Sequence, residues 1–129
     1  MRFEPKQPPR RFEVGNDVKF EMADCGRMHL AADEQITLTT EAGGEYDVAR
    51  KGWGFYATPS LNGRLGRFGL RGVLIRNTLT GRYFVLLVER GQEDAFDGYI
   101  RQESLEIVAW MDSTEALDRL RAALRGGGR

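Results

Sequence analysis

Hydrophobic and polar residues alternate along the first half of the chain, a pattern typical of strands with one solvent-facing side. Residues 18–22 alternate in this way, and residues 28–30 resume the alternation after a turn signal at 24–26. This spacing predicts a hairpin. The alternation continues at 36–39, which predicts a third strand, and two further strands are expected near 46–48 and 55–57. Together these segments predict an antiparallel meander.

The second half of the chain mixes helical periodicity with β-rich runs. Thr58 and Pro59 suit the cap and first position of a helix, and Gly69 suits its end. Strands are expected at 71–76, 83–89 and 105–110, with a helix at 92–102 and a last helix after the capping-box pattern of 112–115. The last helix is expected to bury Leu117, Leu120 and Leu124.

These elements predict an α+β fold. We expect an N-terminal antiparallel β meander followed by a β-hairpin–α–β unit and a C-terminal helix. The strand–helix–strand unit over 83–110 predicts a right-handed crossover between parallel strands, hence a mixed sheet with helices mainly on one face. The chain of 129 residues is expected to hold a Pro/Arg-rich flexible arm (1–12), a single α+β domain (13–124) and a Gly-rich flexible tail (125–129).

Composition excludes several classes of protein. The chain is 41% hydrophobic and 29% charged, as in ordinary globular proteins. No apolar stretch is long enough to span a membrane or to serve as a signal peptide. One cysteine, Cys25, and one histidine, His29, argue against a disulfide framework and a Cys/His zinc site. We therefore expect a cytoplasmic protein with no metal, no cofactor and no membrane partner.

The formal net charge of zero conceals a segregation along the chain. Residues 1–49 carry a net charge of −4, residues 50–90 carry +7 with Glu89 as their one acid, and residues 91–129 carry −3. Two interpretations are open. Either the acidic flanks neutralise the basic middle in the fold, or its arginines are free to bind an anionic partner.

The basic middle supplies the candidate binding residues. Arg64, Arg67 and Arg71 would share one face of a helix that ran that far, and guanidinium groups bind phosphate or carboxylate through paired hydrogen bonds. Aromatic rings beside them are suited to stacking on a base. Polar groups near the expected helix start could hold an anion together with free backbone N–H groups. The candidate ligand-binding set is Trp53, Tyr56, Thr58, Ser60, Asn62, Arg64, Arg67 and Arg71.

The sequence favours a small non-enzymatic binding protein whose partner is a phosphorylated small molecule or a nucleotide. Single-stranded nucleic acid is the next candidate of this class. The alternatives are a small enzyme or accessory subunit completed by a partner chain, and a homo-oligomeric interaction module whose interface is the aromatic segment. We assign no catalytic residue, because neither Cys25 nor His29 is predicted to have the neighbours that a nucleophile needs.

Overall fold

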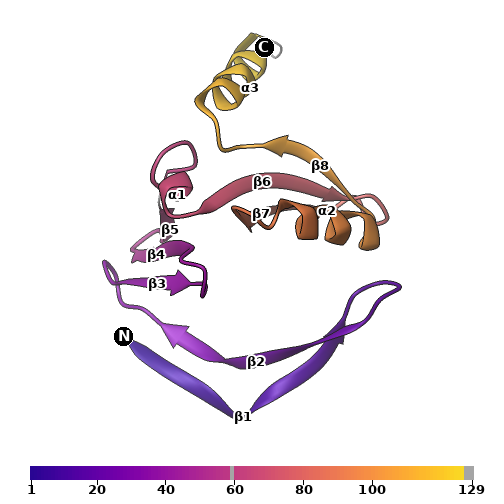
Figure 1. The fold of residues 1–129 in the computed structure, drawn as a ribbon. Coiled ribbons are helices and arrows are strands. Elements are labelled where there is room, and N and C mark those ends of the chain that lie inside the picture. Colours follow the sequence, from indigo (N-terminus) through magenta and orange to yellow (C-terminus); the bar gives the residue numbers. More distant parts are fainter. Residues whose placement is uncertain (59, 127–129) are drawn as a thin grey trace. The chain divides into compact units, whose positions relative to one another are not determined.

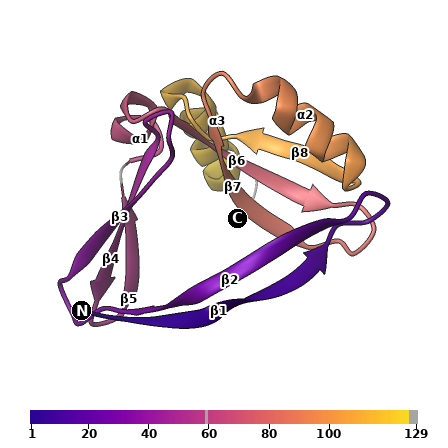
Figure 2. The same ribbon diagram turned by 60° about the horizontal axis from the view of Figure 1, so that its bottom comes forward.

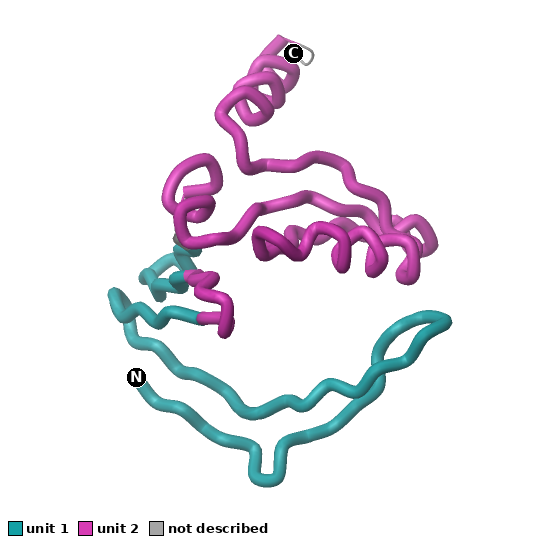
Figure 3. The backbone as a smooth tube through the Cα atoms, in the orientation of Figure 1, with its two compact units in different colours: residues 1–38, 47–58 teal, residues 39–46, 59–129 magenta. Residues whose placement is uncertain are grey.

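The computed structural model describes residues 1–58 and 60–126, except for the side chain of Thr58. The described residues form strands β1–β8 and helices α1–α3, which confirms the predicted α+β class. They group into two compact units (Figure 3). Unit 1 holds residues 1–38 and 47–58, and unit 2 holds residues 39–46 and 59–129. Each unit is described by itself.

Unit 1 begins with a two-stranded ribbon (Figure 1). Strand β1 (Arg2–Val14) pairs antiparallel with β2 (Phe20–His29). The segment expected to be a flexible arm is therefore a paired strand, and the turn predicted at 24–26 is wrong because β2 runs through it. Prolines are compatible with β1 because the outer side of an edge strand needs no N–H donors, and its register shifts between Pro5 and Arg10.

The other strands of the first half form a three-stranded sheet in the order β3-β4-β5. Their bounds are Gln35–Thr39 for β3, Glu45–Lys51 for β4 and Gly54–Thr58 for β5. These bounds confirm the three expected strands. The terminal amino group of Met1 forms an ion pair of 2.9 Å with Glu34, whose carbonyl accepts from the Arg50 N–H of β4 at 2.8 Å. These contacts connect the ribbon to the sheet.

Unit 2 contains the second sheet, with strand order β7-β6-β8. The strands are β6 (Leu70–Asn77), β7 (Tyr83–Glu89) and β8 (Leu105–Trp110), and β6 pairs antiparallel with both neighbours. Strands β7 and β8 consequently run in the same direction, as expected of a strand–helix–strand unit. Because β6 lies between them, however, the hydrogen-bonded pairs are antiparallel, and the expected mixed sheet is corrected on this point.

Helix α2 (Glu93–Gln102) runs alongside this sheet (Figure 2). The core of unit 2 lies between the helix and the sheet. Val73, Ile75 and Val88 are buried there. Phe96 and Ile100 of α2 pack against them. The ring of Trp110 meets that of Phe96 edge to face at 5.9 Å between centroids.

The two other helices differ from expectation. Helix α1 has only four residues (Arg64–Arg67), so it begins well after the predicted start at Thr58 and Pro59, of which Pro59 lies outside the described residues. Helix α3 (Thr114–Gly126) has no buried residue, and Leu120 and Leu124 are 45% and 68% exposed. The buried stripe predicted for α3 is therefore wrong. Of the expected C-terminal tail, residues 127–129 lie outside the described part.

Candidate functional site

The aromatic candidates belong to unit 1. Trp53 lies in the turn between β4 and β5 and is 73% exposed. Tyr56 lies opposite Ala49 in the β4–β5 ladder and is 53% exposed. Thr58 is the last residue of β5, and its side chain lies outside the described part. Both described rings are thus open to solvent, as stacking on a base requires.

The polar candidates before α1 belong to unit 2 and have local partners. Ser60 Oγ accepts a hydrogen bond of 3.1 Å from the Arg64 N–H, and its carbonyl accepts from the N–H groups of Gly63 and Leu65. These N–H groups are therefore occupied rather than free for an anion. Asn62 Nδ2 donates to Thr114 Oγ1 at 3.1 Å, which connects the loop to the start of α3.

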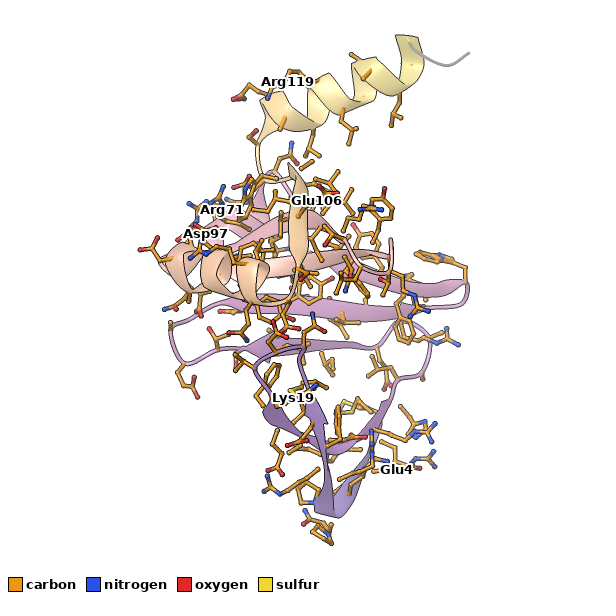
Figure 4. The ribbon with its side chains drawn as sticks, turned by 90° about the vertical axis from the view of Figure 1, so that its right-hand side faces the viewer. Glu4, Lys19, Arg71, Asp97, Glu106 and Arg119 are labelled. Carbon is orange, nitrogen blue, oxygen red and sulfur yellow. The ribbon has the colours of Figure 1, made fainter. Side chains whose placement is uncertain are left out.

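Arg71 lies at the start of β6 and is held by two carboxylates. Its Nε donates to Asp112 Oδ2 at 2.6 Å, its Nη1 reaches Glu93 Oε2 at 3.4 Å, and its guanidinium lies 4.0 Å above the ring of Trp110. The hydrogen bond from Arg71 lowers the pKa of Asp112, and the Arg71 pKa is raised in return. Figure 4 shows Arg71 within unit 2. Arg71 therefore connects β6 to α2 and to the residues before α3, and its guanidinium is not free to bind a ligand.

The predicted arginine face is corrected by these positions. Helix α1 ends at Arg67, and Arg71 belongs to β6, so the three arginines do not share one helix face. The physical reason is Gly69, whose φ of +84° ends the helical turn in the left-handed conformation. Only Arg64 and Arg67 remain together on α1.

A different arginine joins them. Leu70 lies opposite Glu89 in the β6–β7 ladder, so the next residue, Arg90, arrives beside α1. Its Nε donates to the Gly66 carbonyl at 3.2 Å. Arg90 stands 23 residues after Arg67, and helical spacing could not reveal it. The charge count contained the signal, because Arg90 closes the basic segment 50–90.

We call Arg64, Arg67 and Arg90 the α1 arginine cluster. All three residues are exposed, and within residues 1–58 and 60–126 none of them has a carboxylate oxygen at ion-pair distance. The Arg64 guanidinium lies 5.1 Å above the ring of Phe68. Two nearby acids are already engaged: Glu89 accepts from Thr40 Oγ1, and Asp112 accepts from Arg71. The field of Arg90 also lowers the pKa of Asp112, as the weakest of the causes.

The remaining chemistry-bearing residues do not form a site. Cys25 and His29 lie four residues apart in β2, roughly 13 Å at the rise of a strand, which is too far for a nucleophile and its base. His29 Nε2 instead lies 3.3 Å from Glu4 Oε2. In the described part of the chain, no group of three His, Cys, Asp or Glu side chains could hold a metal ion. None of its helices is long and apolar enough to cross a membrane.

Comparisons of the chain with protein-family models, with curated proteins and with solved structures found no match. The functional interpretation therefore depends on the geometry and charge of the residues themselves.

Proposed function

We propose that the chain is a non-enzymatic binding protein of the cytoplasm that holds a phosphorylated small molecule or a nucleotide at the α1 arginine cluster. One observation carries this proposal. Three exposed guanidinium groups gather on and beside a helix of four residues, with no carboxylate at ion-pair distance in the described ranges. By contrast, two other arginines of unit 2, Arg71 and Arg76, are paired with acids.

The chemistry of the cluster suits a phosphoryl group. A guanidinium presents five N–H donors in a rigid plane and binds phosphate oxygens in pairs. Arg90 is positioned in advance, because its Nε is fixed on the Gly66 carbonyl while its two terminal amino groups are available to a ligand. An exposed cluster binds through charge, so we expect the affinity to fall as salt is added.

Single-stranded nucleic acid is a second candidate because of the exposed rings of unit 1. Trp53, Phe55 and Tyr56 are all more than half exposed. Stacking of bases on such rings contributes about 1–3 kcal/mol per base. This candidate predicts that Trp53→Ala and Tyr56→Ala weaken the binding of an oligonucleotide while the binding of a mononucleotide is unchanged.

Isothermal titration calorimetry at low salt tests the primary proposal. Pyrophosphate, ATP and a single-stranded oligonucleotide would be titrated into the wild type, the Arg64→Ala/Arg67→Ala double variant and Arg90→Ala. We expect each removed arginine to weaken pyrophosphate binding about tenfold, as the loss of a charged hydrogen bond predicts. Arg82→Ala is the matched control, because Arg82 is also exposed but follows the loop at the opposite end of the β6–β7 pair.

Two results would contradict the proposal. The first is the absence of heat from pyrophosphate and ATP at millimolar concentration in low salt. The second is an equal loss of affinity in Arg82→Ala and Arg90→Ala, which would indicate attraction by overall charge rather than a site at α1. Oligonucleotide binding without mononucleotide binding would support the second candidate instead.

A further inference from the structure

Unit 1 carries extensive apolar surface without a core of its own. The buried hydrophobic side chains of the described residues are Leu65, Leu70, Val73, Ile75 and Val88, and all of them belong to unit 2. The ribbon of β1 and β2 is only two-stranded, and such hairpins are marginally stable unless another element covers them. We therefore expect another element or another chain to pack on the apolar side of the ribbon.

The two faces of the ribbon differ sharply near its turn. In an antiparallel pair, residues that lie opposite each other project from the same face. Three opposed pairs define what we call the ribbon face: Arg10 with Asp24, Phe12 with Met22, and Val14 with Phe20. Phe20 and Met22 are 40% and 44% exposed.

The opposite face of the same segment is polar. It carries Arg11, Glu13 and Glu21, and Arg11 Nη1 donates to Glu21 Oε1 at 3.1 Å. Water can solvate this face, so only the ribbon face needs covering. Figure 4 labels Glu4 and Lys19, which lie toward the two ends of the ribbon.

Each pair on the ribbon face joins two different residues that attract each other: one pair has opposite charges, and the other two pairs are apolar. A rotation of 180° about the long axis of the ribbon exchanges the positions of β1 and β2. A second copy placed face to face by this rotation would set its Met22 over Phe12, its Phe20 over Val14 and its Asp24 over Arg10. Sulfur and aromatic rings attract each other, and so do opposite charges.

The charged pair lies on the ribbon face, where Asp24 Oδ2 also lies 3.7 Å from Lys6 Nζ and Asp24 Oδ1 accepts the Gly26 N–H at 3.3 Å. The Arg10 guanidinium lies 4.6 Å above the ring of Phe12, and its Nη2 lies 3.5 Å from Asp24 Oδ2. The Arg10 side chain is nevertheless 60% exposed, so it has donors left for a second carboxylate. Unit 1 as a whole holds 8 basic and 8 acidic residues, so two copies meet without net repulsion.

We propose that the ribbon face is a homodimer interface, in which two copies stack their ribbons about a two-fold axis parallel to the strands. The two layers then form a small sandwich with the usual spacing of about 10 Å between sheets. The interface uses the apolar residues nearest the turn and is flanked by reciprocal Arg10–Asp24 contacts. It uses no residue of the α1 arginine cluster, whose residues belong to unit 2.

Sedimentation velocity of the full chain tests the interface. We expect a concentration-dependent dimer for the wild type and a monomer for Phe20→Asp. Ala23→Asp is the matched control, because it places the same charge on the same strand but on the polar face, opposite Arg11. A monomeric wild type throughout the micromolar range would overturn the proposal, as would a dimer that persists in Phe20→Asp.

A charge exchange between Arg10 and Asp24 distinguishes loss of the dimer interface from loss of folding. Arg10→Asp alone and Asp24→Arg alone each set like charges against each other across the two-fold axis, so each variant should be monomeric. A mixture of the two variants should form a heterodimer, because the introduced aspartate of one chain meets the introduced arginine of the other. We expect dimer in the mixture and monomer in either variant alone. Monomers in the mixture would contradict the proposed arrangement.

Discussion

The Arg71–Asp112 pair offers a quantitative test of how unit 2 is held together. Replacing Asp112 by Asn keeps the shape of the side chain and removes its charge. The side chains of Arg71 and Asp112 are 24% and 17% exposed, so their hydrogen bond of 2.6 Å is more sheltered than a surface ion pair. Hydrogen bonds to charged groups contribute about 1.5–3 kcal/mol, and surface ion pairs less than about 1 kcal/mol. We expect Asp112→Asn to lower the free energy of unfolding by about 2 kcal/mol.

Urea denaturation at pH 7 measures this loss. With a denaturant dependence of about 2 kcal/mol per molar, the midpoint should fall by about 1 M. The fluorescence of Trp110, which Arg71 covers, reports on the site in a Trp53→Phe background. Glu106→Gln is the matched control, because it breaks the more exposed Arg76–Glu106 pair of 3.4 Å on the same strand, and it should cost less than about 1 kcal/mol.

The pKa of Asp112 also predicts how the stability difference between the wild type and Asp112→Asn changes with pH. Arg71 lowers the pKa of Asp112 in the folded state, so the folded protein favours the ionised carboxylate more than the unfolded chain does. This stabilisation is complete above the unfolded pKa of about 4 and disappears as the pH falls through the lowered folded value. The wild type and Asp112→Asn should therefore differ most above pH 5 and converge in strong acid. An equal difference at pH 7 and pH 2.5, or none at pH 7, would refute the reasoning.

Three further substitutions test other parts of the description. Leu65→Ala should destabilise the protein by about 2–5 kcal/mol in urea, because Leu65 is 1% exposed; a loss under about 1 kcal/mol would show that this site is not packed. Ser113→Ala should cost about 1 kcal/mol and reduce helical circular dichroism, because Ser113 Oγ accepts the Ala116 N–H of α3 at 3.1 Å, whereas unchanged stability would exclude this cap. Trp53→Phe should change stability by less than about 0.5 kcal/mol, since Trp53 is 73% exposed, and a larger loss would place it in a packed site.

Local patterns predicted most elements but not how they pair. The apolar run of β7 and the helical spacing of apolar residues in α2 indicated the type of each element. The run did not predict burial, because β7 lies at the edge of its sheet and Tyr83, Phe84 and Val85 are exposed. Pairing depends on segments distant in the sequence, and the alternation of 18–30 fits a hairpin and a single long strand equally well. The prolines of β1 weighed against a strand, yet a two-stranded ribbon has only edges, where proline is tolerated.

The sequence predicted a basic candidate site but not which arginines form it. The excess of arginine in 50–90 was visible in the sequence, whereas its division between paired and unpaired side chains was not. Arg71 meets Asp112 only because β6 and β8 are neighbours, and Arg90 meets Gly66 only because β7 returns beside β6. The charge segregation along the chain is not a segregation between the compact units, because each unit holds equal numbers of basic and acidic residues.

The most direct test of the anion-binding proposal is a map of amide chemical shifts during a pyrophosphate titration of the ¹⁵N-labelled chain. The proposal predicts that the largest shifts occur at the amides of Gly66, Arg67 and Arg90, that they saturate with added ligand, and that they weaken with salt. Shifts that leave these three amides unchanged, or that spread evenly over exposed arginines such as Arg82 and Arg119, would contradict it.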